Sequence, residues 1–222
     1  MPGIIILFIF VVIVLVVFSI VYAIRQEKKR REALGAFAES NGFTYAEKVD
    51  SPDDVGLPDI ELFGRGRRRR WTNVMAGEVQ GTAVRVLDYR YTTGSGKNSS
   101  TTQQTVVAVE AGGAGGAGLP NFTLAREHFF HKIGQAFGYQ DIDFDEFPEF
   151  SKKYLLRGAD EAAIRGLFNA RLIDAYVSGE ANNAEVRDGW LFIYQQGRRV
   201  KPELIQKRIE SAFSLLFELT GA

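Results

Sequence analysis

The chain has 222 residues, no cysteine, and equal numbers of basic and acidic side chains, 27 of each. Without cysteine the fold does not depend on disulfides, which agrees with a reducing compartment. Because the net charge is zero, no overall field attracts nucleic acid, and we expect no nucleic-acid partner.

A long apolar segment at the start of the chain predicts a transmembrane helix over residues 4–24. Residues 4–18 are apolar without a break, and only Ser19 interrupts the run before Ile24. A helix of this length spans about 31 Å, close to the thickness of the hydrocarbon core. A cleaved secretory signal is the alternative, but Met1-Pro2-Gly3 has no charged side chain and Val21-Tyr22-Ala23 is a poor cleavage site.

Basic residues directly after the span predict its orientation. They are opposed nearby only by Glu27, and they are Arg25, Lys28, Lys29, Arg30 and Arg31. Basic residues that flank a span stay on the cytoplasmic side. We therefore expect a single-pass protein of the cytoplasmic (inner) membrane, with its N-terminus outside and its soluble part in the cytoplasm.

Two connecting segments follow the span. Residues 25–42 predict a stalk helix, because Leu34, Phe37 and Ala38 fall on one face and Asn41-Gly42 suits a C-terminal stop. Residues 43–62 predict a linker, since residues 50–61 combine acidic side chains with Pro and Gly. Residues 63–222 would then form the soluble domain, either as one unit or as subdomains 63–138 and 139–222.

The first half of this domain predicts an antiparallel meander. Strands are indicated at Trp71–Val79, Thr82–Thr92 and Thr102–Glu110 by β-branched and aromatic residues, with Gln80-Gly81 as a turn. A short strand is expected around Phe122 and a helix over Arg126–Phe137. Ile142 and Phe144 alternate with acids in a short extended segment.

The last third predicts a β-α-β-β-α unit. A strand is expected over Phe150–Arg157, and Asp160 would cap a helix that runs to about Val177. Asp188-Gly189 suits the tight turn of a hairpin, and Pro202 would open a final amphipathic helix. Together with the meander, this order predicts an α+β fold.

Several stretches in residues 119–158 carry a family resemblance: LPNFTLARE, then DIDFD, then EFSKKYLLRG. With the preceding meander, they resemble uncharacterised bacterial single-pass membrane proteins that carry a domain of unknown function. The resemblance covers roughly residues 60–220. It implies a membrane anchor and a cytoplasmic α+β domain, and it supplies no catalytic residue.

Glycine-rich motifs do not predict a nucleotide site. Residues 113–118 match G-x-G-x-x-G, but the next residues read as extended, whereas the dinucleotide fingerprint needs a helix there. Gly94-Ser95-Gly96-Lys97 resembles a phosphate loop, yet Tyr91 and Asn98 replace its defining Gly and hydroxyl residues. We interpret both as loops and expect no cofactor.

Metal-binding residue types are few. His128 and His131 would lie on one helical face, and a third ligand could come from Asp141, Asp143 or Asp145. There is no Cys and no HExxH order, so we expect ordinary histidines and no metal site. The acids fail the calcium-loop pattern because Glu146 replaces its glycine.

The strongest local charge run predicts a surface contact. It consists of Arg65, Arg67, Arg68, Arg69 and Arg70, followed by Trp71. Near an anionic leaflet each basic residue contributes about 1 kcal/mol of attraction, so lipid headgroups or an acidic partner are the expected contacts. The alternative is a solvated face that pairs with the acids of residues 50–61.

No G-x-S-x-G, S-x-x-K or cysteine nucleophile is present in the sequence. We therefore favour a non-catalytic, membrane-anchored interaction module. Such a module would be an accessory or scaffolding subunit of a larger respiratory, photosynthetic or transport complex, with the bilayer and membrane proteins as partners. The alternative is a membrane-bound enzyme or ligand-binding protein with a site around His128, His131 and the acids of residues 141–145.

Overall fold

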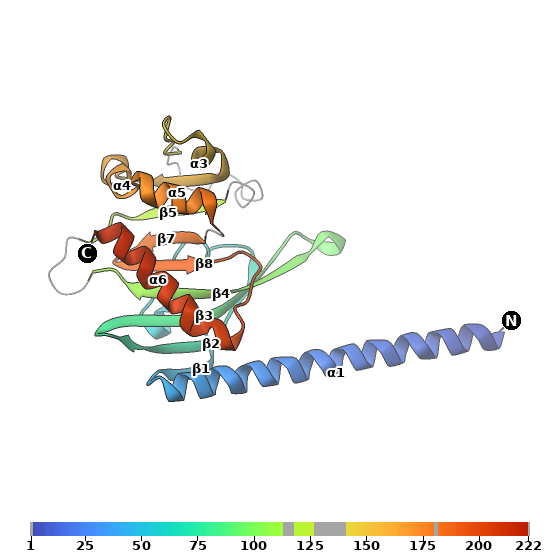
Figure 1. Ribbon diagram of the computed structural model, residues 1–222. Helices are drawn as coiled ribbons and strands as arrows, with labels where there is room; N and C mark the ends of the chain where they lie inside the picture. Colours follow the sequence, from blue (N-terminus) through green and yellow to red (C-terminus); the bar gives the residue numbers. More distant parts are fainter. Residues whose placement is uncertain (1, 113–117, 127–140, 180–181, 222) are drawn as a thin grey trace.

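The computed structural model describes residues 2–112, 118–126, 141–179 and 182–221. It has an α+β architecture, as predicted, with one long helix that projects from a large antiparallel sheet (Figure 1). Because strands from residues 63–138 and from residues 139–222 hydrogen-bond within this sheet, both halves of the soluble part contribute to one structural layer.

The long helix α1 (Pro2–Ser40) contains both the predicted span and the predicted stalk without a break. Residues 5–26 are exposed, and α1 is the one helix among the described residues that is long and apolar enough to cross a membrane. The helix ends where the sequence predicted, since Gly42 adopts a left-handed conformation with φ of 73°. At the domain end, Leu34 and Ala38 are buried.

The sheet has eight strands in the order β1-β2-β3-β4-β8-β7-β5-β6. The strands are β1 (Thr44–Val49), β2 (Arg67–Val79), β3 (Thr82–Thr93), β4 (Ser100–Glu110), β5 (Phe122–Arg126), β6 (Tyr154–Gly158), β7 (Asn183–Arg187) and β8 (Trp190–Tyr194). The predicted meander is therefore confirmed as β2, β3 and β4. The predicted hairpin joins β7 to β8, with positive φ at Asp188 and Gly189.

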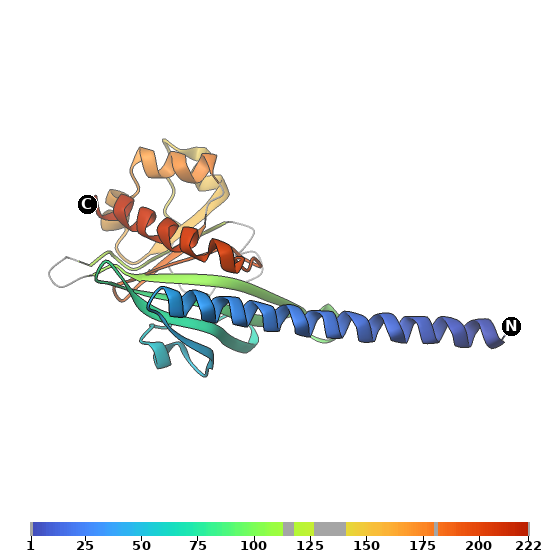
Figure 2. The same cartoon turned by 60° about the horizontal axis from the view of Figure 1, so that its bottom comes forward.

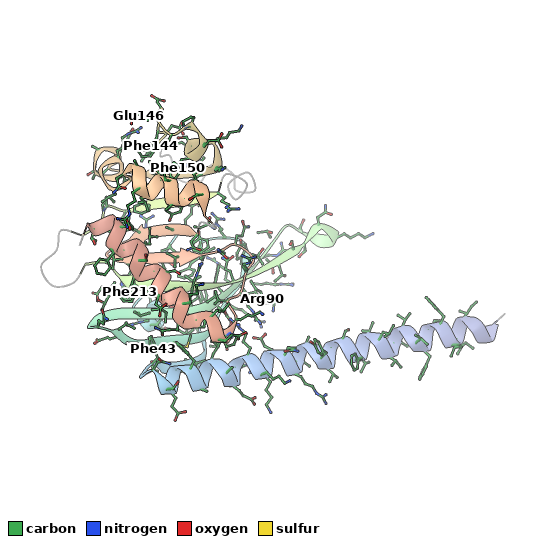
Figure 3. All side chains as sticks on the ribbon, viewed as in Figure 1. Phe43, Arg90, Phe144, Glu146, Phe150 and Phe213 are labelled. Carbon is green, nitrogen blue, oxygen red and sulfur yellow. The ribbon has the colours of Figure 1, made fainter. Side chains whose placement is uncertain are left out.

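Helices cover one face of the sheet. They are α3 (Pro148–Lys153), α4 (Glu161–Leu167), α5 (Ala170–Ser178) and α6 (Ile205–Thr220), with short 3₁₀ turns η1 (Pro52–Val55), η2 (Gly96–Asn98) and η3 (Pro202–Leu204). Figure 1 shows α6 crossing the sheet, while α3, α4 and α5 lie at the end far from α1. Phe144 and Phe150 pack together at that far end (Figure 3), with ring centroids 5.8 Å apart.

The opposite face has its own core, and the predicted linker forms part of it. Residues 43–62 begin with β1, and Leu57, Ile60 and Leu62 are buried against the second face together with Phe63. The prediction of a surface linker was wrong because its apolar residues, scattered among acids and prolines, show neither helical nor strand periodicity. Only the sheet surface opposite them explains their burial.

Other local predictions needed correction. Residues 148–153 form α3 before β6 begins at Tyr154, so the strand predicted from Phe150 starts later. The helix predicted after Asp160 is two helices, because the Asn169 side chain accepts a hydrogen bond from Leu172 N and starts α5. The extended segment around Ile142 is not a strand, although its N–H donates to Leu156 O.

The predicted helix Arg126–Phe137 falls largely outside the described residues, and Arg126 itself belongs to β5. The hairpin that joins β3 to β4 projects beyond the rest of the sheet. Figures 1 and 2 show that it points in the same direction as the N-terminal end of α1. The starts of β2 and β4 and the end of β3 therefore lie on the side of the domain that faces along the projecting helix.

Candidate membrane-proximal site

A buried ion pair fixes α1 to the sheet. Arg30 Nε and Nη2 donate to the two carboxylate oxygens of Asp88 at 2.7 and 2.8 Å, and both side chains are less than a tenth exposed. Asp88 also accepts hydrogen bonds from Thr105 Oγ1 and Asn73 Nδ2. This bidentate geometry holds the helix in one orientation, because neither charge can be left unpaired in the interior at low cost.

Exposed ion pairs flank the buried one. Glu27 accepts hydrogen bonds from both terminal nitrogens of Arg199, the shortest at 2.9 Å, and Arg31 Nη1 donates to Glu47 at 3.0 Å. The basic flank that predicted the orientation of the span is thus partly committed to the domain itself. The sequence held a signal for this: Arg30, Leu34 and Ala38 are spaced by four and share one helical face.

A cleft of about 370 Å³ lies beside this junction, between α1, strands β1 to β4 and the segment that precedes η3. Basic side chains dominate its lining, namely Arg31, Lys48, Arg70, Arg90 and Arg199. Its acidic side chains are Glu27, Glu47 and Asp88. Cations therefore outnumber anions around the opening.

Two arginines of the cleft face each other across neighbouring strands. Arg70 of β2 and Arg90 of β3 are direct Cα partners, so their side chains emerge on the same face of the sheet. Both are exposed, and within the described part of the chain the structure gives neither of them an ion-pair or hydrogen-bond partner. Like charges in directly opposite positions destabilise a sheet, which makes this arrangement costly without an anion. Figure 3 labels Arg90 on the side of the sheet from which α1 and the hairpin project.

The structure divides the predicted basic run. Arg65 is buried and pairs with Glu61 at 3.5 Å, and Arg69 Nη1 donates to Phe63 O at 2.8 Å. Trp71 packs edge-on against Phe63, with ring centroids 6.0 Å apart. The expectation that Arg65 and Trp71 contribute to a surface contact is therefore corrected, since both are directed into the second core.

Arg67, Arg68 and Arg70 remain on the surface. They lie at the start of β2, where the register with β3 shifts between Arg67 and Arg70 and Arg68 has a positive φ of 53°. This irregularity rotates successive side chains out of strict alternation. The surface contact predicted for these arginines stays a prediction.

The alternative site predicted around the histidines is not assembled by the described residues. His128 and His131 lie outside them, and Asp141 pairs with Arg157 at 2.6 Å. The Asp143 carbonyl accepts from Arg165 Nη1, and no group of three potential metal ligands occurs in the part of the chain that the structure describes. Most of the glycine-rich motif, residues 113–117, also lies outside the described residues, and the strand β5 follows it.

A second buried carboxylate, which the sequence analysis did not single out, lies on the opposite face of the sheet. Glu185 of β7 is 1% exposed and accepts hydrogen bonds from Glu61 N, Leu62 N and Tyr194 Oη. Burial raises its pKa to about 7, although these hydrogen bonds and the charge of Arg65 act in the other direction. Glu185 thereby holds the covering segment on the second core.

Comparison with known proteins gives one structural relative and no sequence relative. No protein-family profile and no curated sequence matches this chain. The fold is similar to that in the crystal structure of the mycobacterial trehalose monomycolate transport factor A, TtfA, with a TM-score of 0.57 and 15% sequence identity. The match covers 86% of this chain and 94% of that chain, so the fold is shared over most of both. The resemblance to bacterial single-pass proteins of unknown function stays a prediction.

Proposed function

We propose that this protein is a membrane-anchored, non-catalytic accessory module of a transport assembly, with its soluble domain at the cytoplasmic surface. One observation carries the proposal: the apolar segment of α1 continues as an unbroken helix into a stalk that Arg30 and Asp88 lock to the sheet. A flexible tether would only localise the domain, whereas a locked helix also fixes which face it presents to the membrane.

The charge distribution supports the same geometry. Glu27 and Arg31 follow Ile24 by one and two helical turns, or about 4.5 and 10 Å of rise. The headgroup layer is about 5 to 8 Å deep on each side of the hydrocarbon core. The stalk therefore brings the cleft to the edge of this layer, and the exposed Arg67 and Arg68 lie on the same side of the domain.

The fold similarity to a mycobacterial transport factor favours transport among the assemblies considered. A non-catalytic role agrees with the chemistry of the described residues, whose two most buried carboxylates hold covering segments in place. We infer that partners are recognised by the surface of the domain and that the span serves as an anchor.

Gentle extraction of the tagged full chain tests this proposal. We expect it to migrate well above the mass of a lone 24.7 kDa chain in its micelle and to retain a multi-span transport protein after crosslinking. The matched control replaces residues 4–24 by an unrelated apolar span and should retain the same partner. Migration of both forms as single chains would contradict an accessory role.

The orientation is tested with a reporter enzyme that is active only outside the cytoplasm. Fused after Ala222 it should be silent, and fused before Met1 it should be active. The reverse pattern would place the domain outside and exclude the cytoplasmic proposal.

The contact of the basic strand start with lipid is tested with residues 25–222 and vesicles. Replacing Arg67 and Arg68 by Gln should weaken attachment to anionic vesicles, more at 50 mM than at 300 mM salt, because screening removes surface attraction. Equal attachment by both forms would discard this contact.

A further inference from the structure

We propose that the cleft beside α1 binds the phosphate group of one membrane lipid, with Arg70 and Arg90 as its ligands. This inference rests on the proposed membrane anchoring. It assigns a specific ligand chemistry to a cleft that the anchoring alone does not require.

The pairing of charges inside the cleft is the first argument. Each acid of the lining is already engaged: Glu27 by Arg199, Glu47 by Arg31 and Asp88 by Arg30. Lys48 is paired with Asp50 at 2.8 Å. The positive charge in excess is therefore that of Arg70 and Arg90.

The placement of these two residues is the second argument. Two guanidinium groups on directly opposite positions of β2 and β3 repel each other, and an anion between them converts that repulsion into attraction. Guanidinium forks match the oxygens of phosphate in bidentate geometry. Gln103 is the β4 partner of Arg90 and also lines the cleft, so its amide adds neutral donors to the same row.

The position of the cleft decides the source of the phosphate. Its wall is formed by Glu27 and Arg31, which lie within about 10 Å of rise of the end of the span. A volume of about 370 Å³ lies in the range of small-ligand sites, so the cleft holds one headgroup and leaves the acyl chains in the bilayer beside α1. A soluble phosphate compound would have no need of a site at this depth.

Native mass spectrometry of the full chain tests the proposal. The protein is released from neutral detergent micelles that contain phosphatidylglycerol, a neutral diacylglycerol, or inorganic phosphate. We expect the wild type to retain one phosphatidylglycerol per chain. The R70Q/R90Q variant should retain it about tenfold less or weaker, because two charged hydrogen-bond partners are lost.

The matched control is R67Q/R68Q, which removes the same charge from the same strand outside the cleft. It should keep the single lipid, while R70Q/R90Q should still be anchored and fold with an unchanged circular dichroism spectrum. Equal losses in both variants would show diffuse surface attraction and overturn the site. So would a wild type that retains no phosphatidylglycerol, or one in which inorganic phosphate displaces the lipid at equal concentration.

These outcomes are separate from those of the proposed function. Loss of partner co-purification with intact lipid retention would contradict the accessory role and leave the cleft standing. Intact co-purification with no lipid retained would do the opposite.

Discussion

The two faces of the sheet each hold a covering segment through a buried carboxylate, but they solve the electrostatic problem differently. On one face Asp88 meets the guanidinium of Arg30 and receives two further hydrogen bonds from neutral side chains. On the other face Glu185 meets two backbone amides and the hydroxyl of Tyr194, with Arg65 as a weaker electrostatic influence.

This difference separates a permanent contact from a titratable one. A carboxylate in contact with a full positive charge stays ionised, so α1 is held at any ordinary pH. A buried carboxylate held mainly by neutral donors pays for its charge in desolvation, which is why the pKa of Glu185 rises to about 7. The helix that orients the domain therefore uses the pH-independent arrangement.

Truncation gives the largest expected effect on this comparison. A fragment of residues 25–222 retains Arg30, Leu34 and Ala38 and should be soluble and cooperatively folded. A fragment that starts at Asn41 leaves Asp88 buried without its partner and exposes an apolar sheet surface, so it should lose at least about 5 kcal/mol and fail to fold. Circular dichroism and urea unfolding distinguish the two. A folded shorter fragment would show that α1 only covers the sheet.

The Arg30→Ala substitution should cost about 3–5 kcal/mol in the free energy of unfolding, because it leaves the Asp88 charge buried and unpaired. The control is Arg31→Ala, whose pair with Glu47 is exposed and should be worth less than about 1 kcal/mol. Urea unfolding of the 25–222 fragment measures both. Similar losses for the two variants would remove the distinction between the buried and the exposed pair.

Glu185 should give the protein a pH-dependent stability. Its pKa is raised from 4.5 to about 7 on folding, so the contribution is fully present below about pH 4.5 and is lost as the pH rises through 7. The loss over this window is about 3 kcal/mol. Glu185→Gln should remove that slope, whereas the exposed control Glu210→Gln should retain it. Unfolding free energies measured from pH 4.5 to 8 test this, and an unchanged slope in Glu185→Gln would contradict it.

The smallest expected effect concerns the cleft. Relieving the repulsion between Arg70 and Arg90 by R70Q/R90Q should raise the unfolding free energy by about 0.5 kcal/mol in the absence of lipid. With anionic lipid present the order should reverse, because only the wild type gains binding energy. Thermal unfolding with and without phosphatidylglycerol measures this. A destabilised double variant without lipid would mean that the two arginines serve the fold.

Local features were set by the sequence wherever the determining contacts are close along the chain. The apolar span follows from composition alone, because a helix in lipid satisfies its own backbone. The turns at Gln80-Gly81 and Asp188-Gly189 follow from residues that tolerate positive φ, and the caps at Asp160 and Asn169 from side chains that accept a nearby N–H. The final helix shows its buried face as a repeat that a single segment displays.

Only the tertiary structure decided which charges and which apolar residues are buried. Arg30 reads as one more cation of a membrane flank until Asp88, 58 residues away, closes on it. The acidic segment 50–62 reads as a linker until Glu185, more than 120 residues later, fixes it over the second core. Arg70 and Arg90 become a pair only through strand register. Burial and charge pairing depend on contacts between distant segments, and no local pattern encodes them.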